Sequence, residues 1–165
     1  MRLTDCSAHV IALSGDALPC LVALERRGVP PLVAPSLFVI GIDARGVDTR
    51  AALAALLRRH RRGDCVIPSS VAHVIAVIHH DAPPDWVSAK VHRWMLSIHR
   101  RMQRSRGVDT DVAALLVDQS VTPALLATRL EELVHRAPGA NSASVLTADE
   151  IRNQTIAQAS TNDFI

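Results

Sequence analysis

The sequence predicts an α/β or α+β protein, in which a small N-terminal layer of strands and helices is followed by a helical C-terminal half. Two observations predict this class. Up to residue 67, short β-branched apolar runs alternate with helix-like stretches, which is the element order of an α/β layer. After residue 83, apolar residues recur at helical spacing between helix starts and stops. A mainly α fold is the alternative, because a short apolar run can also belong to a buried helix.

The expected strands are short apolar runs that end at turn residues. Residues 9–14, HVIALS, and residues 37–43, LFVIGID, combine β-branched side chains with a following turn. Residues 65–67, CVI, are expected to form a third short strand. Residues 36–46 and 69–80 stay open between strand and helix, because both ranges begin with serines, which cap helices well.

Helices are expected where apolar residues follow a capping residue and stop at a breaker. Residues 16–27 and 48–62 fit this pattern in the first half, and a glycine follows each of them. In the second half, helices are expected over residues 85–106, 109–119 and 123–136.

The length of 165 residues predicts one domain with a tail. Residues 1–136 are expected to form the single globular domain. Apolar residues make up 48% of the chain and aromatic residues only 2%, so its core is expected to consist of Ala, Leu, Val and Ile. From residue 137 onward Asn, Ser, Ala and Thr dominate, which predicts a flexible C-terminal tail over residues 137–165 with a weak helix signal at 147–159.

The composition argues against several classes of protein. The three cysteines, Cys6, Cys20 and Cys65, form no CxxC pair, so neither a disulfide framework nor a zinc knuckle is expected. No apolar run approaches the ~20 residues that span a membrane, and the N-terminus has no signal-peptide pattern. We therefore expect a cytoplasmic protein without a membrane partner. The excess of arginine over lysine favours a GC-rich bacterial source.

The net charge of +2 hides a strong segregation of charge along the chain. Residues 45–106 hold twelve basic and four acidic side chains, whereas residues 107–165 hold three basic and eight acidic ones. Such a basic middle can attract a polyanion, or it can pair with the acidic end of its own chain.

On the helix expected over residues 85–106, basic side chains fall opposite the apolar stripe. This side carries no acidic residue, whereas ordinary surface helices mix both signs. A solvated outer face is the simplest interpretation. The functional interpretations are a docking face for an acidic protein, through Arg–carboxylate pairs, or for nucleic acid, through phosphates. The candidate partner-binding residues are Lys90, Arg93, Arg100, Arg101 and Arg104, extended by Arg58, Arg59 and Arg62 of the preceding helix.

No catalytic or metal-binding motif is present. Adjacent His79 and His80 point different ways in any regular structure, and His92 and His99 lie about 10 Å apart along a helix, too far apart to share a metal. No metal and no cofactor are therefore expected. Asp43 follows an apolar strand, at the edge where open α/β sheets place ligands, so Asp43, His79 and His80 are the candidates for acid–base catalysis.

These patterns together predict a non-enzymatic bacterial protein, a regulator or an assembly accessory, that binds an acidic partner protein through its arginine-rich amphipathic helix. A nucleic-acid-binding regulator that uses the same face is the first alternative. Its total charge of +2 is small, however, and two Trp, two Phe and no Tyr offer few rings for base stacking. A small α/β enzyme acting on an anionic substrate is the second alternative. Valine- and isoleucine-rich segments also allow a homo-oligomer.

Overall fold

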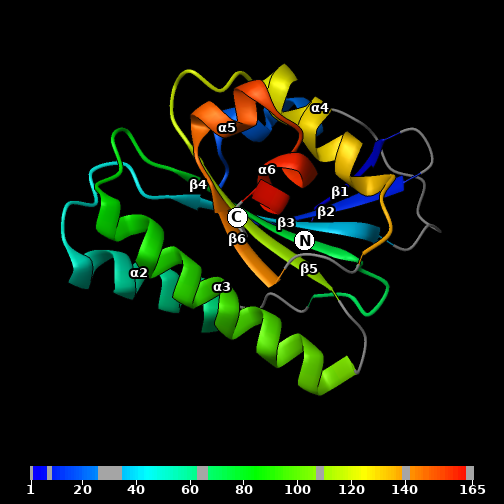
Figure 1. The fold of residues 1–165 in the computed structure, drawn as a ribbon, viewed down its shortest axis with the longest axis horizontal. Helices are drawn as coiled ribbons and strands as arrows, with labels where there is room; N and C mark the ends of the chain where they lie inside the picture. Colours follow the sequence, from blue (N-terminus) through cyan, green and yellow to red (C-terminus); the bar gives the residue numbers. More distant parts are fainter. Residues whose placement is uncertain are drawn as a thin grey trace.

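The structure is a computed structural model that describes residues 2–6, 9–25, 35–62, 67–106, 110–138 and 142–162. Its centre is a sheet of six strands in the order β1-β2-β3-β4-β5-β6 (Figure 1). β1 pairs with β2 in antiparallel fashion, and the strands from β2 to β6 are parallel. The strands are β1 (Arg2–Cys6), β2 (His9–Gly15), β3 (Pro35–Asp43), β4 (His73–His79), β5 (Asp111–Val117) and β6 (Ser142–Leu146). The expected α/β class is confirmed.

Helices cover both faces of the sheet. α2 (Arg50–Arg62) and α3 (Asp85–Arg106) lie side by side on one face, and we call this pair the α2–α3 layer (Figure 1). The other face carries the α4 layer. It consists of the 3-10 turn η1 (Pro19–Leu21), α1 (Val22–Glu25), α4 (Pro123–Val134), α5 (Ala148–Asn153) and α6 (Ile156–Asn162).

Side chains of each strand alternate between these two layers. In β3, Leu37 and Val39 pack toward the α4 layer, whereas Phe38 and Ile40 pack toward the α2–α3 layer. Both faces are therefore dry, and the central strands are apolar almost throughout instead of alternating between apolar and polar residues.

The two ranges that periodicity left open contain strands. Residues 36–46 include most of β3, and residues 69–80 include β4. Valine and isoleucine fill three positions of β3 and four of β4, and their branched side chains suit the pleated sheet. Of the strand expected at 65–67, residues 65 and 66 lie outside the described residues, and residue 67 belongs to no strand.

The helix expected over residues 109–119 is wrong, because residues 111–117 form β5. The sequence DVAALLV has no polar face, and all seven residues are buried. A continuous apolar run of this length fits a central parallel strand better than a surface helix. Of the helix expected over residues 16–27, residues 16–18 are not helical, and the described helical part consists of η1 and α1. Residues 26 and 27 lie outside the described residues.

The described part of the expected tail is folded against the sheet. β6 pairs with β5 as an edge strand, and α5 and α6 follow it. Leu146, Ile151 and Ile156 of this segment are buried in the core between the sheet and the helices of the α4 layer. The helix signal at 147–159 corresponds to these two helices. In the described ranges, no helix combines the length and the apolar character that a bilayer crossing requires.

Candidate functional site

Positive charge gathers on the α2–α3 layer. α2 contains five arginines and no carboxylate, and α3 contains six basic residues and one carboxylate, Asp85. Acidic residues of the C-terminal half lie elsewhere, with Glu131 and Glu132 in α4 and Asp149 and Glu150 in α5. The sheet separates these two groups, so the charge segregation of the sequence becomes a segregation between two layers.

Six cations of this layer have no carboxylate partner among the described residues. Within the described parts of the chain, no ion pair involves the six cations Arg58, Lys90, Arg93, Arg100, Arg101 and Arg104. The side-chain hydrogen bond that Arg93 makes is internal to α3, from its Nε to the carbonyl oxygen of Ala89 at 3.2 Å. The acidic helices form their own pairs, for example Glu132 with Arg129 at 3.0 Å.

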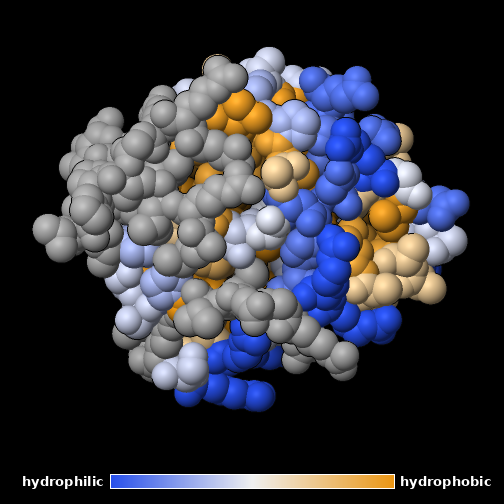
Figure 2. Space-filling view, turned by 180° about the vertical axis from the view of Figure 1, so that it is seen from behind, coloured by the Kyte–Doolittle hydropathy of each residue, from blue (hydrophilic) through white to orange (hydrophobic). Residues whose placement is uncertain are grey.

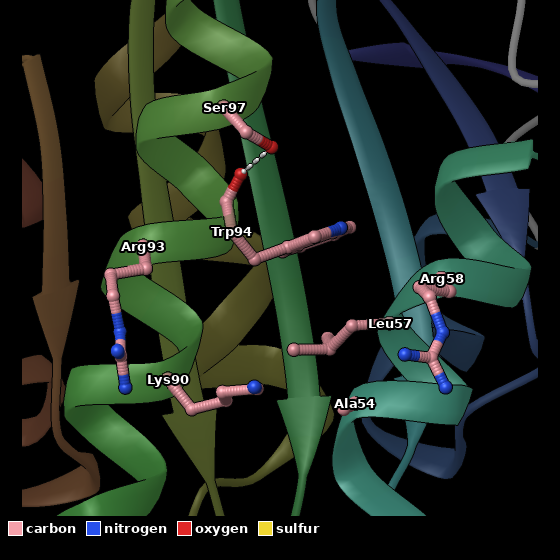
Figure 3. Close-up of a pocket in the computed structure, with 7 residues that line it drawn as sticks. All are labelled: Ala54, Leu57, Arg58, Lys90, Arg93, Trp94 and Ser97. Carbon is pink, nitrogen blue, oxygen red and sulfur yellow. Dashed lines mark hydrogen bonds between the residues drawn. The ribbon is translucent and has the colours of Figure 1, made fainter. Parts of the chain in front are cut away.

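A groove of about 250 Å³ lies between α2 and α3 (Figure 3). Its floor is apolar, because Leu57 is buried and the Trp94 side chain extends from α3 toward α2. Trp94 is only 7% exposed, and its indole Nε1 has no hydrogen-bond partner among the described residues. The lining consists of Ala54, Leu57 and Arg58 from α2 and Lys90, Arg93, Trp94 and Ser97 from α3.

A second hollow of about 550 Å³ continues along α3. Arg100, Arg101 and Arg104 line it together with Ser97 and Ser105. Ser97 lines both hollows, so they lie next to each other along α3. The view from behind shows hydrophilic side chains gathered in a band, with apolar side chains next to it (Figure 2).

The structure brings six of the eight predicted partner-binding residues to these two hollows. Arg59 of α2 instead reaches Asp16, with its NH2 group 3.1 Å from Oδ1. The side chain of Arg62 lies outside the described residues. Sequence reasoning missed Trp94 as a lining residue, because its helical spacing placed it in the apolar stripe and nothing in the pattern showed that α2 stops short of covering it.

Aromatic rings available for base stacking are scarce on this surface. Phe38 and Trp94 are buried, and Trp86 is half-buried with the guanidinium carbon of Arg50 5.9 Å from its ring centroid. In the described ranges, therefore, no exposed Trp or Phe ring accompanies the basic residues, and the His92 imidazole is the exposed ring on α3. This arrangement suits a polyanion without bases better than a single-stranded nucleic acid.

The candidate catalytic residues lie at the C-terminal edge of the parallel strands. Asp43 ends β3 and is in register with His79, which ends β4. The Asp43 carboxylate accepts hydrogen bonds from Arg45, at 2.9 Å from Nε and 2.6 Å from NH2. The Arg45 guanidinium lowers the pKa of Asp43 to about 2, so this carboxylate is an anion at neutral pH and a poor proton acceptor.

The rings of His79 and His80 differ in their hydrogen bonds. His80 Nδ1 accepts the backbone N–H of Ala82 at 3.3 Å, and its Nε2 lies 3.1 Å from the Val47 carbonyl oxygen. Both nitrogens therefore hold loops in place, and no lone pair is left for catalysis. His79 is 6% exposed, and neither of its ring nitrogens has a hydrogen-bond partner among the described residues.

Asp16 joins this edge from the end of β2. Its Oδ2 accepts the backbone N–H of Asp43 at 2.9 Å and lies 3.2 Å from Nε2 of His60. Burial lowers the pKa of His60, an effect that the charge of Asp16 partly opposes. Sequence reasoning missed Asp16 because an aspartate after a strand also reads as a helix cap.

The described residues show neither a metal-binding cluster nor a reactive cysteine. No cluster of three or more His, Cys, Asp or Glu side chains with ligand geometry occurs among the described residues. Cys20 is buried in the core, and burial raises the pKa of its thiol to about 11, so the reactive thiolate is rare at neutral pH.

Comparison with known proteins adds no information to this geometry: no family model, no curated protein and no solved structure matches the chain.

Proposed function

We propose that this protein is a non-enzymatic binding module that docks an acidic segment of a partner protein on the α2–α3 layer. The observation that carries the proposal is a set of six cations beside an apolar groove, none of which has a carboxylate partner in the described part of the chain. A bacterial cytoplasmic regulator or assembly accessory would use such a surface. The free, buried thiol of Cys20 is consistent with a reducing compartment.

The shape of the groove favours a protein segment. Leu57 and Trp94 offer an apolar floor that would bury a large aliphatic side chain, a contact worth about 1.5–3 kcal/mol. Arg58 and Arg93 stand on opposite walls and can pair with carboxylates on either side of that side chain (Figure 3). An amphipathic helix with leucines on one face and glutamates on its flanks supplies both features, in the helix-in-groove mode of recognition.

Trp94 allows a direct test, because Trp86 and Trp94 are the two tryptophans of the chain. In a Trp86→Phe background, a synthetic amphipathic Leu/Glu peptide should change the Trp94 emission in a saturable way. The double variant Arg58→Glu, Arg93→Glu should weaken binding by about tenfold or more, since each reversal replaces attraction with repulsion. Arg136→Glu, an exposed site beyond the end of α4, is the matched control and should leave the affinity unchanged.

Competing ligands separate the alternatives. Increasing salt should lower the affinity for the peptide, because salt screens the charge pairs. It should not abolish binding, because part of the affinity comes from the apolar floor. The proposal fails if the charge-reversed variant binds the peptide as well as the parent does. It also fails if a duplex or single-stranded oligonucleotide displaces the peptide at much lower concentration, which would make nucleic acid the partner.

A further inference from the structure

The connections that leave β2 and β3 diverge. β2 leads to η1 and α1 in the α4 layer, whereas β3 leads to α2 on the opposite face. When neighbouring parallel strands send their connections to opposite faces, a crevice opens beyond their C-terminal ends, and open α/β sheets bind ligands in such crevices. A cavity of about 590 Å³ occupies this place, lined by Asp16, Asp43, Arg45, Leu56 and Arg59.

Two arginines in this crevice are held in fixed positions. Arg45 binds both oxygens of Asp43, and Arg59 binds Asp16 at 3.1 and 3.2 Å. Their side chains are nevertheless 45% and 64% exposed. A guanidinium group has five N–H donors, so donors remain on both arginines after these pairs are made. Because the pairs already restrict both side chains, little conformational entropy is left to lose when a ligand binds.

The carboxylates that hold these arginines are themselves anchored to the backbone of the sheet. Asp16 donates its N–H to the carbonyl oxygen of Gly41 at 2.8 Å, and its side chain accepts the N–H of Asp43. Next to Asp43, neither nitrogen of the buried His79 imidazole has a hydrogen-bond partner among the residues that the structure describes. Buried polar groups are rarely left without a partner, so this edge of the sheet has hydrogen-bonding capacity that the described part of the chain does not use.

We propose that this crevice is a second site, which binds a small molecule bearing an oxyanion, a phosphate or a carboxylate, through the guanidinium groups of Arg45 and Arg59. The site is independent of the groove between α2 and α3. Asp16 and Asp43 position the two arginines.

Charge and geometry both favour an anion over a cation. The carboxylates of Asp16 and Asp43 are already occupied by guanidinium groups, so a cationic ligand would have to break those pairs. The free donors belong to the arginines, whose planar N–H groups match the oxygens of phosphate and carboxylate.

Inorganic phosphate is the probe for the test, with chloride at equal ionic strength as reference. In ¹H–¹⁵N spectra of the full chain, phosphate should shift the Arg45 and Arg59 Nε–H signals in a saturable way. Arg45→Gln and Arg59→Gln should each weaken this binding by about tenfold, because a charge-assisted hydrogen bond is lost. Arg45→Lys keeps the charge but not the paired N–H geometry, so its affinity should lie between those of Arg45→Gln and the parent.

Several outcomes would overturn the proposal. Shifts that grow linearly with phosphate, or that persist unchanged in both glutamine variants, would show general ionic-strength effects only. Saturable shifts centred on Arg58, Lys90 and Arg93 would place the anion in the α2–α3 groove instead. The Arg58→Glu, Arg93→Glu variant should bind phosphate in the crevice as the parent does, so this site and the docking groove can fail separately.

Discussion

Two glycines allow β2 and β3 to end close together. Gly15 has φ +85°, and a Cβ there would lie 2.2 Å from the carbonyl oxygen of Gly41. A Cβ on Gly41 would lie 2.4 Å from the carbonyl oxygen of Asp16. No side chain fits at either position, and this close approach brings Asp16 within hydrogen-bonding distance of the β3 backbone.

Gly15→Ala is therefore expected to destabilise the fold strongly. The left-handed conformation costs an alanine about 1 kcal/mol, and relief of the overlap with Gly41 costs about 1–3 kcal/mol more. Gly46→Ala is the matched control, because Gly46 also has a positive φ of 71° but nothing lies within 4 Å of its Cβ position. Urea unfolding should show a loss of about 1 kcal/mol for the control and clearly more for Gly15→Ala. Equal losses would show that the backbone conformation alone matters.

For single residues, the sequence predicted on which face of a helix a side chain lies better than which side chains of different elements form pairs. Helical spacing placed Lys90, Arg93 and Arg100 together on the outside of α3, because a helical wheel depends only on residue number. The pairing of Asp16 with Arg59 joins residues 43 positions apart in the chain. Nothing in either local segment indicates such a contact, so the crevice was not predictable from them.

At the scale of elements, the local sequence pattern determines the secondary structure of α3, whereas burial in the tertiary structure determines that of β5. α3 begins at Asp85 and ends at Arg106, as predicted, because its two faces differ in polarity along the whole length. β5 has alanines and leucines, which also suit a helix, and it is a strand because both of its faces are covered. A segment buried on all sides has no polar face from which to read a period.

The start of α4 is stabilised by a helix cap that is already visible in the local sequence. The Thr122 hydroxyl accepts the N–H of Leu125 at 3.2 Å, and Pro123 occupies the first turn. Thr122→Ala should lower the free energy of unfolding by about 1 kcal/mol, because the N–H group loses its partner.

Thr128→Ala, within the same helix, is the control for that substitution. The Thr128 hydroxyl only donates back to the carbonyl oxygen of Ala124, and the residue is exposed. Alanine is the better helix former there, so no loss of stability is expected in urea unfolding. An equal loss in both variants would mean that the effect is not one of capping.

For the whole molecule, the arrangement of the connections could not be predicted from the order of the elements. Parallel strands that follow each other through a sheet normally have right-handed crossovers, which would place all connecting helices on one face. Here α2 and α3 lie on one face and α1 and α4 on the other, so the two pairs of crossovers have opposite hands. This departure both separates the basic helices from the acidic ones and opens the crevice beyond β2 and β3.

The same architecture makes the C-terminal segment part of the fold. A chain that ends at Pro138 lacks β6, α5 and α6, which exposes apolar residues of β5 and α4 to water. We expect this truncated chain to lose the dispersed NMR spectrum and the cooperative urea transition of the full chain, because its core is incomplete.

Two point variants show whether packing of the C-terminal segment is the cause. Ile151 of α5 is fully buried in the core between the sheet and the α4 layer, so Ile151→Ala should cost about 2–5 kcal/mol while the chain remains folded. Thr161 is exposed on α6 and its hydroxyl only donates back to the carbonyl oxygen of Ala157, so Thr161→Ala should change stability by less than about 1 kcal/mol. A truncated chain that keeps a dispersed spectrum, together with an Ile151→Ala variant as stable as the parent, would mean that residues 142–162 rest on a domain that is complete without them. In that case the acidic helix α5 would be free to leave the sheet, and the separation of charge between the two layers would depend on where this segment docks.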